Sequence, residues 1–381
     1  MNAATHRVRD WALRHLARPR PAQDFVPQID GLRCVAIVAV VLFHMEGYVA
    51  DALGQTRPDT FLHHLLRQGN FGVPLFFALS GYIIACPFFG PKPPKLGAYF
   101  LRRITRLEPP YIFNMLLIFA LKVAVSGMAV AALFPHLLVS LLYQHGLVYG
   151  EHSLVNGVAW SLEVEWQFYL WAPLLFALVL RLRPAWRGAG LWLLILAGGL
   201  AHQFADGLPH RLALTLLHYF GFFVGGVWVA TCEARWPRGQ GHKAHDALGL
   251  CAALAIVWVL MRQPGWQFTL PAMTGLLVFA ALRGPVSRLI LGWWPVHCIG
   301  AMCYTLYLYH FFVVSLVGRE LQRFPGWPQD ADRAMLLMAT CGLPVVIAAC
   351  VVPYLLIERP FMVWRPGRNR LRDAFRQRVT T

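Results

Sequence analysis

Long apolar segments separated by short polar loops dominate this chain. A helix needs about 20 mostly apolar residues to cross the roughly 30 Å hydrocarbon core of a bilayer. An interrupted apolar stretch at 134–149 indicates a re-entrant or interfacial segment. We predict an all-α, polytopic integral membrane protein with about ten transmembrane helices, at residues 34–50, 70–89, 111–132, 162–181, 189–205, 213–232, 245–261, 267–282, 297–318 and 334–357.

The loops between these segments differ sharply in charge. Because Lys and Arg concentrate in cytoplasmic loops, their distribution indicates orientation. The N-terminal segment, every second loop and the tail hold 26 of the 34 basic residues, the opposite loops hold seven, and Lys122 lies within a predicted span. Both termini are therefore predicted to be cytoplasmic. Residues 8–18 have an amphipathic pattern and predict a helix lying on the membrane surface.

The composition agrees with a membrane protein. Hydrophobic residues make up 57% of the chain and charged residues 14%, with a formal net charge of +16, which excludes a disordered chain or a small disulfide scaffold. Nucleic-acid binding would need a clustered basic face, whereas here the basic residues recur loop by loop. We expect membrane lipid and no nucleic acid as a partner. The eight cysteines are dispersed without zinc-ligand spacing, so we expect no metal site.

The first predicted span carries two ionisable residues, Arg33 and His44. Eleven residues bring them within about 20° of one helical face and separate them by roughly 16 Å along the axis. This arrangement could address a long ligand, with its charged head at Arg33 and its reactive end at His44. The alternative is a histidine satisfied by a neighbouring helix and an arginine that only marks the end of the span.

The segment from Arg102 to Tyr111 enters the third predicted span. Arg103 and Arg106 are three residues apart, so a helix places both guanidinium groups on one face, which suits phosphate binding. Ordinary anchoring at the membrane surface is the alternative. Pro109 and the following proline are expected to break the helix here.

Two glutamates, Glu163 and Glu165, begin the fourth predicted span, on the extracytoplasmic side. Glu165 and Tyr169 are four residues apart and face the same neighbour. A carboxylate here could orient an imidazole, act as a base or bind sugar hydroxyls. Ser80 in the second span and His310 in the ninth are further polar residues within apolar runs.

Taken together, these segments resemble the membrane-bound acyltransferase family 3. The resemblance extends from residue 29 to residue 361 and departs from the family pattern at Cys34 and Trp166. It rests on the Arg33–His44 spacing, the run 76–82, Arg103 and Arg106 followed by Pro110 and Tyr111, the signature 160–169 containing Glu165, the run ending at His310, and the Glu-Arg-Pro at 358–360.

The resemblance implies transfer of an acyl group, with acetyl the leading expectation, from cytoplasmic acyl-CoA to a hydroxyl of a cell-surface or lipid-linked saccharide, in a bacterial inner membrane. Acyl-CoA would be a co-substrate, and no tightly bound cofactor is expected. Alternatives are acylation of a small natural product such as a macrolide on the cytoplasmic side, or a proton-coupled transporter. The oligomeric state is left open.

The same resemblance assigns roles to individual residues. The expected catalytic residues are His44, Arg33 and Glu165. The expected substrate-binding residues are Arg102, Arg103, Arg106, Tyr111, Glu163, Tyr169, Ser80 and His310. Whether the acyl group passes directly or through an acyl-histidine stays open. The predicted organisation is a cytoplasmic segment at 1–28, a transmembrane core at 29–361 and a basic cytoplasmic tail at 362–381.

Overall fold

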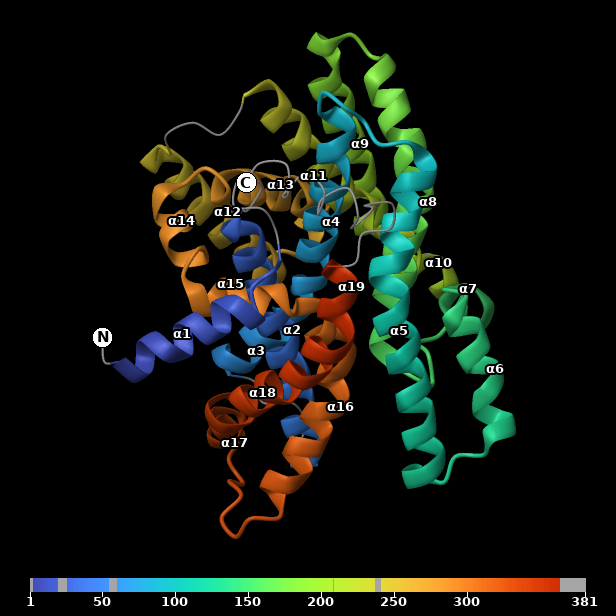
Figure 1. Cartoon of the computed structure of the whole chain (residues 1–381), viewed down its shortest axis with the longest axis vertical. Helices are drawn as coiled ribbons and strands as arrows, with labels where there is room; N and C mark the ends of the chain where they lie inside the picture. The colour runs from blue at the N-terminus through green and yellow to red at the C-terminus, as the bar shows by residue number, and fades with distance from the viewer. Residues whose placement is uncertain (1–2, 20–25, 55–59, 208, 237–240, 364–381) are drawn as a thin grey trace, which may run out of the picture.

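The computed structural model describes residues 3–19, 26–54, 60–207, 209–236 and 241–363, and it is entirely helical over these ranges, without a strand (Figure 1). The α-helices are α1 (Ala3–His15), α2 (Pro27–Ala52), α3 (Phe61–Arg67), α4 (Gly72–Phe89), α5 (Leu96–Ser126), α6 (Val130–Leu141), α7 (His145–Tyr149), α8 (Trp160–Arg181), α9 (Pro184–Gln203), α10 (His210–Ala213), α11 (Leu216–Arg235), α12 (Lys243–Arg262), α13 (Leu270–Ala281), α14 (Pro285–Leu291), α15 (Trp294–Ala301), α16 (Cys303–Gln322), α17 (Ala331–Leu337), α18 (Leu343–Pro353) and α19 (Arg359–Val363). Short 3₁₀ turns precede α4, α8, α10 and α13, and single π-helical turns follow α17 and α18.

Within the described residues, six helical stretches are long and apolar enough to cross a membrane. Two further stretches qualify as bent pairs: 264–281 with 285–291, bent by 87°, and 294–301 with 303–322, bent by 77°. The described part of the chain therefore has six to eight candidate membrane helices, and the count of ten and the orientation of the termini stay predictions. The apolar stretch at 134–149 forms α6 and α7, two short helices.

α2 lies at the centre of the bundle and packs against α4, α15 and α16. α4 and α11 cross closely because each helix has a glycine against the backbone of the other. A Cβ on Gly81 of α4 would overlap the carbonyl oxygen of Phe223, and a Cβ on Gly226 of α11 would overlap that of Ala78. Small residues at such crossings allow helices to approach without side chains between them. The close crossing fixes the face of α4 that carries Ser80.

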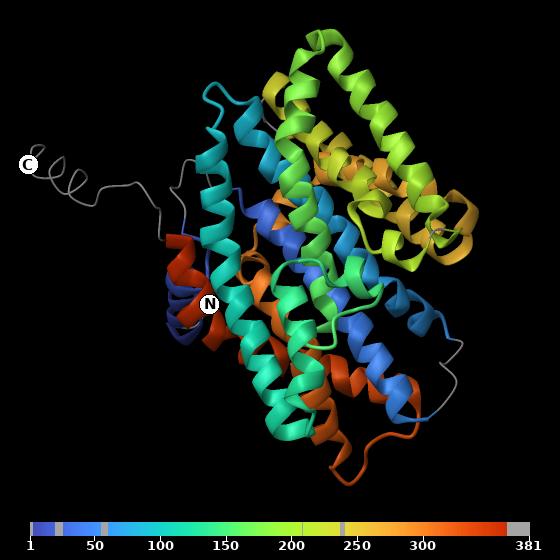
Figure 2. The same ribbon diagram turned by 90° about the vertical axis from the view of Figure 1, so that its right-hand side faces the viewer.

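α5 differs from the sequence prediction, because it runs unbroken through Pro109 and Pro110 over 31 residues. Prolines are tolerated within membrane helices where neighbouring groups satisfy the disturbed backbone. The Tyr304 hydroxyl donates to the Leu107 carbonyl in this turn at 2.9 Å. Figure 2 shows the long α5 beside the shorter α6.

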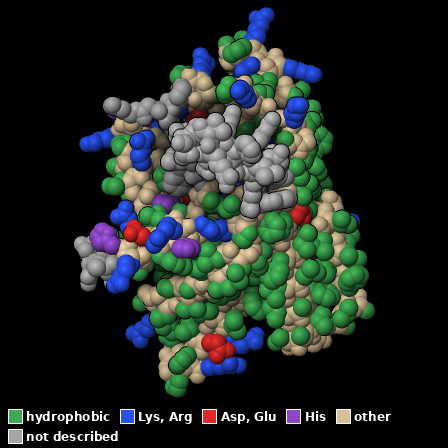
Figure 3. Space-filling view, viewed as in Figure 1, with side chains coloured by type: hydrophobic (Ala, Val, Ile, Leu, Met, Phe, Trp, Pro, Cys, Tyr) green, Lys and Arg blue, Asp and Glu red, His purple; other side chains and the backbone are tan. Residues whose placement is uncertain are grey.

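The outer surface of the bundle is strongly apolar. In Figure 3 the flank formed by α5 and α6 is covered with hydrophobic side chains, whereas Lys and Arg gather at the upper end and the left margin. Large side chains such as Leu116, Leu193 and Leu254 are 49%, 68% and 61% exposed. An exposed apolar belt of this extent is typical of a lipid-facing surface.

The N-terminal segment forms α1, and its Ala12 is buried while Val8 and Trp11 remain exposed. α1 lies beside α19 (Figure 2), so it packs on the protein as well as presenting an apolar outer edge. The predicted basic tail lies, from residue 364 onward, outside the described residues. All eight cysteines are free thiols, and five of them are buried.

Candidate active site

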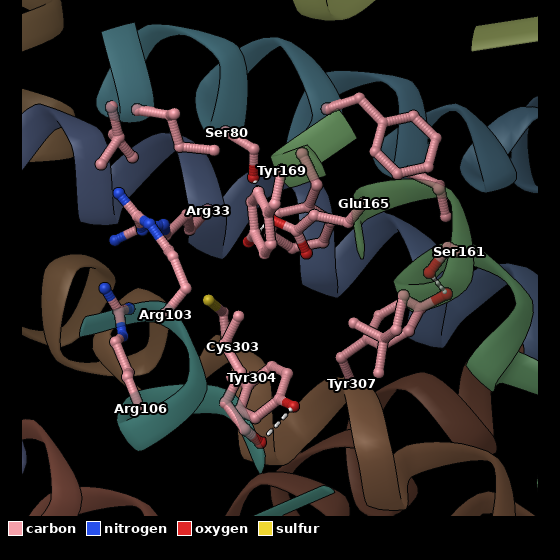
Figure 4. A pocket seen from close by; sticks show the side chains of 17 residues that line it. Arg33, Ser80, Arg103, Arg106, Ser161, Glu165, Tyr169, Cys303, Tyr304 and Tyr307 are labelled. Atoms are coloured by element: carbon pink, nitrogen blue, oxygen red, sulfur yellow. Dashed lines mark hydrogen bonds between the residues drawn. The ribbon is translucent and has the colours of Figure 1, made fainter. Parts of the chain in front are cut away.

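A cavity lies between α2, α4, α5, α8 and α16. Its walls are mostly apolar, but ten polar side chains or sulfur groups face it from five helices (Figure 4). A mostly apolar pocket with a few convergent polar groups is the usual form of a small-molecule site. The ten are Arg33, Ser80, Arg103, Arg106, Ser161, Glu165, Tyr169, Cys303, Tyr304 and Tyr307.

One end of the cavity is cationic. Arg33 from α2 and Arg103 and Arg106 from α5 gather there, as Figure 4 shows. Arg33 is held by Asp30, whose Oδ1 lies 2.6 Å from the Arg33 Nη1. The Arg103 guanidinium lies 5.6 Å from the centre of the Tyr169 ring. Arg103 and Arg106 are three residues apart in α5, and both guanidinium groups face the cavity, as the helical periodicity predicts.

The middle of the cavity is organised around Glu165. Both the Ser80 hydroxyl and the Tyr169 hydroxyl donate hydrogen bonds to its Oε1. Ser80 comes from α4 and Tyr169 from the next turn of α8, so the carboxylate is held from two helices. Its Oε2 makes no hydrogen bond with another of the described residues. The arrangement gives a fixed carboxylate that can accept a hydrogen bond from a hydroxyl entering the cavity.

The far end of the cavity is closed by Tyr307. Its hydroxyl accepts a hydrogen bond from Ser161 at 2.6 Å and donates one to the Val158 carbonyl at 3.0 Å. The ring of His310 lies behind Tyr307, with 5.6 Å between the ring centres. His44 lies beyond His310 at 5.0 Å. His44 therefore does not line the cavity but sits behind its end wall.

The hydrogen bonds of His310 determine its tautomer. Its Nδ1 lies 2.8 Å from the Tyr307 carbonyl and 3.1 Å from the Leu306 carbonyl, so this nitrogen carries the proton and donates. Its buried Nε2 has no hydrogen-bond partner among the described residues. In this tautomer Nε2 is an acceptor, and His44 meets the His310 ring through a ring contact and not through a hydrogen bond.

Four residues expected to bind substrate lie outside the cavity: His310, described above, and three others. Arg102 is exposed, and the buried Tyr111 donates its hydroxyl hydrogen to the Ser140 carbonyl at 2.8 Å. Glu163 accepts a hydrogen bond from the Gly146 amide at 2.9 Å, which fixes α7 to the start of α8. A contact between these side chains and substrate stays a prediction.

The cavity also contains residues that the sequence reasoning did not select: Ser161, Cys303, Tyr304 and Tyr307. Tyr304, Tyr307 and His310 recur every three residues in α16, which places them along one helical face. That periodicity could have identified the two tyrosines.

The start of α16 is held by a residue from the far end of the chain. The buried Glu358 accepts hydrogen bonds from the Thr305 amide at 3.0 Å and from its hydroxyl at 2.6 Å. Amides in the first turn of a helix lack intrahelical partners, so a carboxylate there is stabilising. No group of three or more metal-ligating side chains occurs in the part of the chain that the structure describes.

The sequence was compared with families of known proteins. Residues 26–355 match the sequence model of acyltransferase family 3, described as an acyltransferase domain. The chain belongs to acyltransferase family 3. It is thus an acyltransferase, and the apolar helices agree with a multi-pass membrane member of that family.

Two relatives illustrate the range of this family. Acyltransferase MdmB of Streptomyces mycarofaciens is 27% identical over 372 residues, covering 88% of this chain and 92% of the relative. Peptidoglycan O-acetyltransferase OatA of Listeria monocytogenes is 25% identical over 358 residues, covering 80% of this chain but 51% of the relative. The chain therefore spans nearly all of the first protein and about half of the second. No solved structure matches it.

Proposed function

We propose that this family 3 acyltransferase moves an acyl group, in the simplest case acetyl, from acyl-CoA to a hydroxyl of a cell-surface or lipid-linked saccharide in a bacterial inner membrane. The observation that carries the proposal is the order in which charged and polar side chains follow one another along the cavity. Arginines occupy one end of the cavity, a hydroxyl-bonded carboxylate occupies the middle, and a histidine pair lies behind the far wall.

The cationic end suits the phosphates of the donor. Guanidinium groups bind phosphate oxygens through two parallel hydrogen bonds. With the phosphates near Arg33, Arg103 and Arg106, the arm of the donor extends past Glu165 toward Tyr307. The rise of about 16 Å between Arg33 and His44 on α2 then separates the charged head from the reactive end.

His44 is proposed as the general base. It takes the proton from the acceptor hydroxyl, whose oxygen attacks the thioester carbonyl carbon. The carbon–sulfur bond then breaks, and the imidazolium returns its proton to the thiolate of CoA. An acyl group carried first on a His44 nitrogen is the second route, with the same donor and product. In either route the Tyr307 ring has to swing aside, because it separates the cavity from the histidine pair.

Glu165 is proposed to hold the acceptor. Its carboxylate already accepts two hydroxyl hydrogen bonds, from Ser80 and Tyr169, so a sugar hydroxyl is a chemically equivalent partner. The Listeria relative is named a peptidoglycan O-acetyltransferase, which favours a saccharide acceptor. The Streptomyces relative is named only as an acyltransferase, which indicates no acceptor, and a small natural product stays the second acceptor class.

The test uses His44→Ala in membranes supplied with labelled acetyl-CoA, with the exposed His64→Ala as the control. Loss of label from surface glycans in the first variant and retention in the second is the expected result. Product formation unchanged in His44→Ala would remove His44 from the mechanism. Mass spectrometry of glycan and soluble fractions from cells with and without the protein separates the two acceptor classes.

A further inference from the structure

The N-terminal segment is joined to the core by polar contacts. The Tyr354 hydroxyl donates to the Leu16 carbonyl at 2.9 Å, and the Arg359 Nη2 donates to the Arg14 carbonyl at 2.7 Å. Both donors come from the last helical turns of the described chain. These contacts hold the end of the segment in place and carry Arg18 to the first turn of α2.

Arg18 is almost completely buried, with 4% of its side chain exposed. Its Nε lies 3.1 Å from Asp30 Oδ1, the same oxygen that pairs with Arg33. Its buried Nη1 and Nη2 have no hydrogen-bond acceptor among the described residues. Leaving buried donors of a charged group unsatisfied is costly. We therefore expect a bound ligand to supply the hydrogen-bond acceptor for these two nitrogens.

The charges around Arg18 show what kind of ligand fits. Arg106 interacts electrostatically with Arg18, Arg33 and Arg103, so the four cations form one cluster. The carboxylates that act on Arg18 are those of Asp30 and Glu358. Four guanidinium groups against two carboxylates leave an excess of positive charge, and Glu165 further along the cavity reduces it without cancelling it. Buried charges require partners, so the missing acceptor is an anion.

We propose that Arg18 is a fourth arginine of the donor's phosphate site, contributed by a segment that precedes the residues matched to the family. Arg18 shares Asp30 with Arg33 of the cationic end, and its two Nη groups donate to a phosphate group in the bidentate manner of guanidinium. The identity of the phosphate as that of acyl-CoA rests on the proposed function. A phospholipid headgroup presents the same chemistry and is the other source that the experiment has to separate.

The experiment compares binding of CoA, of pantetheine, which lacks the phosphates, and of phosphatidylglycerol to the purified full chain in detergent. Arg18→Lys keeps the charge beside Asp30 but removes the two Nη donors. Arg14→Ala removes an exposed arginine from the same segment and is the matched control. We expect Arg18→Lys to weaken CoA binding about 10- to 100-fold, with pantetheine binding unchanged. Arg14→Ala is expected to bind all three probes like the wild type.

Equal CoA affinity in Arg18→Lys and Arg14→Ala would overturn the proposal. So would a loss of the same factor for CoA and pantetheine, because this pattern indicates a purely structural role. If the wild type binds phosphatidylglycerol through Arg18 but does not bind CoA, the phosphate site stands and acyl-CoA falls as the donor. If the wild type binds neither CoA nor phosphatidylglycerol, both the phosphate site and the acyl-CoA donor are refuted. The melting temperature without ligand, unchanged in Arg18→Lys, shows that the variant is folded.

Discussion

Glu165→Gln is the substitution that most directly tests the centre of the cavity. The amide keeps an oxygen in place of Oε1, so Ser80 and Tyr169 can still donate to it, but the negative charge is lost. A hydrogen bond to a charged group contributes about 1.5–3 kcal/mol against about 1 kcal/mol for a neutral one. Two weakened bonds amount to about 1–4 kcal/mol, or roughly 5- to 800-fold in rate if they act in the transition state.

The assay measures kcat for transfer of label from acetyl-CoA to glycan in proteoliposomes, normalised to folded protein. Glu320→Gln is the control, since this carboxylate is exposed, pairs with Arg323 near the end of α16 and does not line the cavity. We expect the control to retain kcat within about threefold of the wild type. A loss of similar size in both variants, or no loss in Glu165→Gln, would refute the assignment of Glu165 to the site.

Two further predictions concern the arginines and the helix packing. The double variant Arg103→Ala with Arg106→Ala should raise the KM for acyl-CoA more than tenfold, a loss of about 1.4 kcal/mol or more, and leave the KM for acceptor nearly unchanged. The exposed Arg181→Ala is its control, and an unchanged donor KM would leave membrane anchoring as the role of the two arginines. Gly300→Ala should lower the free energy of unfolding by about 2 kcal/mol or more, because the added Cβ overlaps the Asp30 carbonyl where α15 crosses α2. Thermal unfolding in detergent measures this loss, and a variant as stable as the wild type would contradict the close crossing.

The sequence alone predicted those features that depend on local periodicity or on the bilayer. Apolar length located most of the helices, because a lipid-facing segment has to be long and apolar. The spacing of Arg103 and Arg106, and of Glu165 and Tyr169, predicted which side chains share a face, because both pairs lie within a turn or so of one helix.

Contacts between distant segments could not be predicted in the same way. The burial of Arg18 depends on how the N-terminal segment docks, and the placement of His44 behind Tyr307 depends on the approach of α16 to α2. The unbroken course of α5 through its prolines depends on packing partners from elsewhere in the chain. Each of these is a tertiary effect that local spacing does not encode.

The contact between Glu358 and Thr305 has a consequence for the synthesis and membrane insertion of the enzyme. The face of α16 that carries Tyr304, Tyr307 and His310 is anchored by a carboxylate synthesised more than fifty residues later. A chain still emerging from the ribosome already contains α2, with Arg33 and His44, long before this anchor exists. The wall that Tyr304 and Tyr307 form is thus completed only when the last helical turns have entered the bundle, so we expect catalytic competence only after insertion is finished.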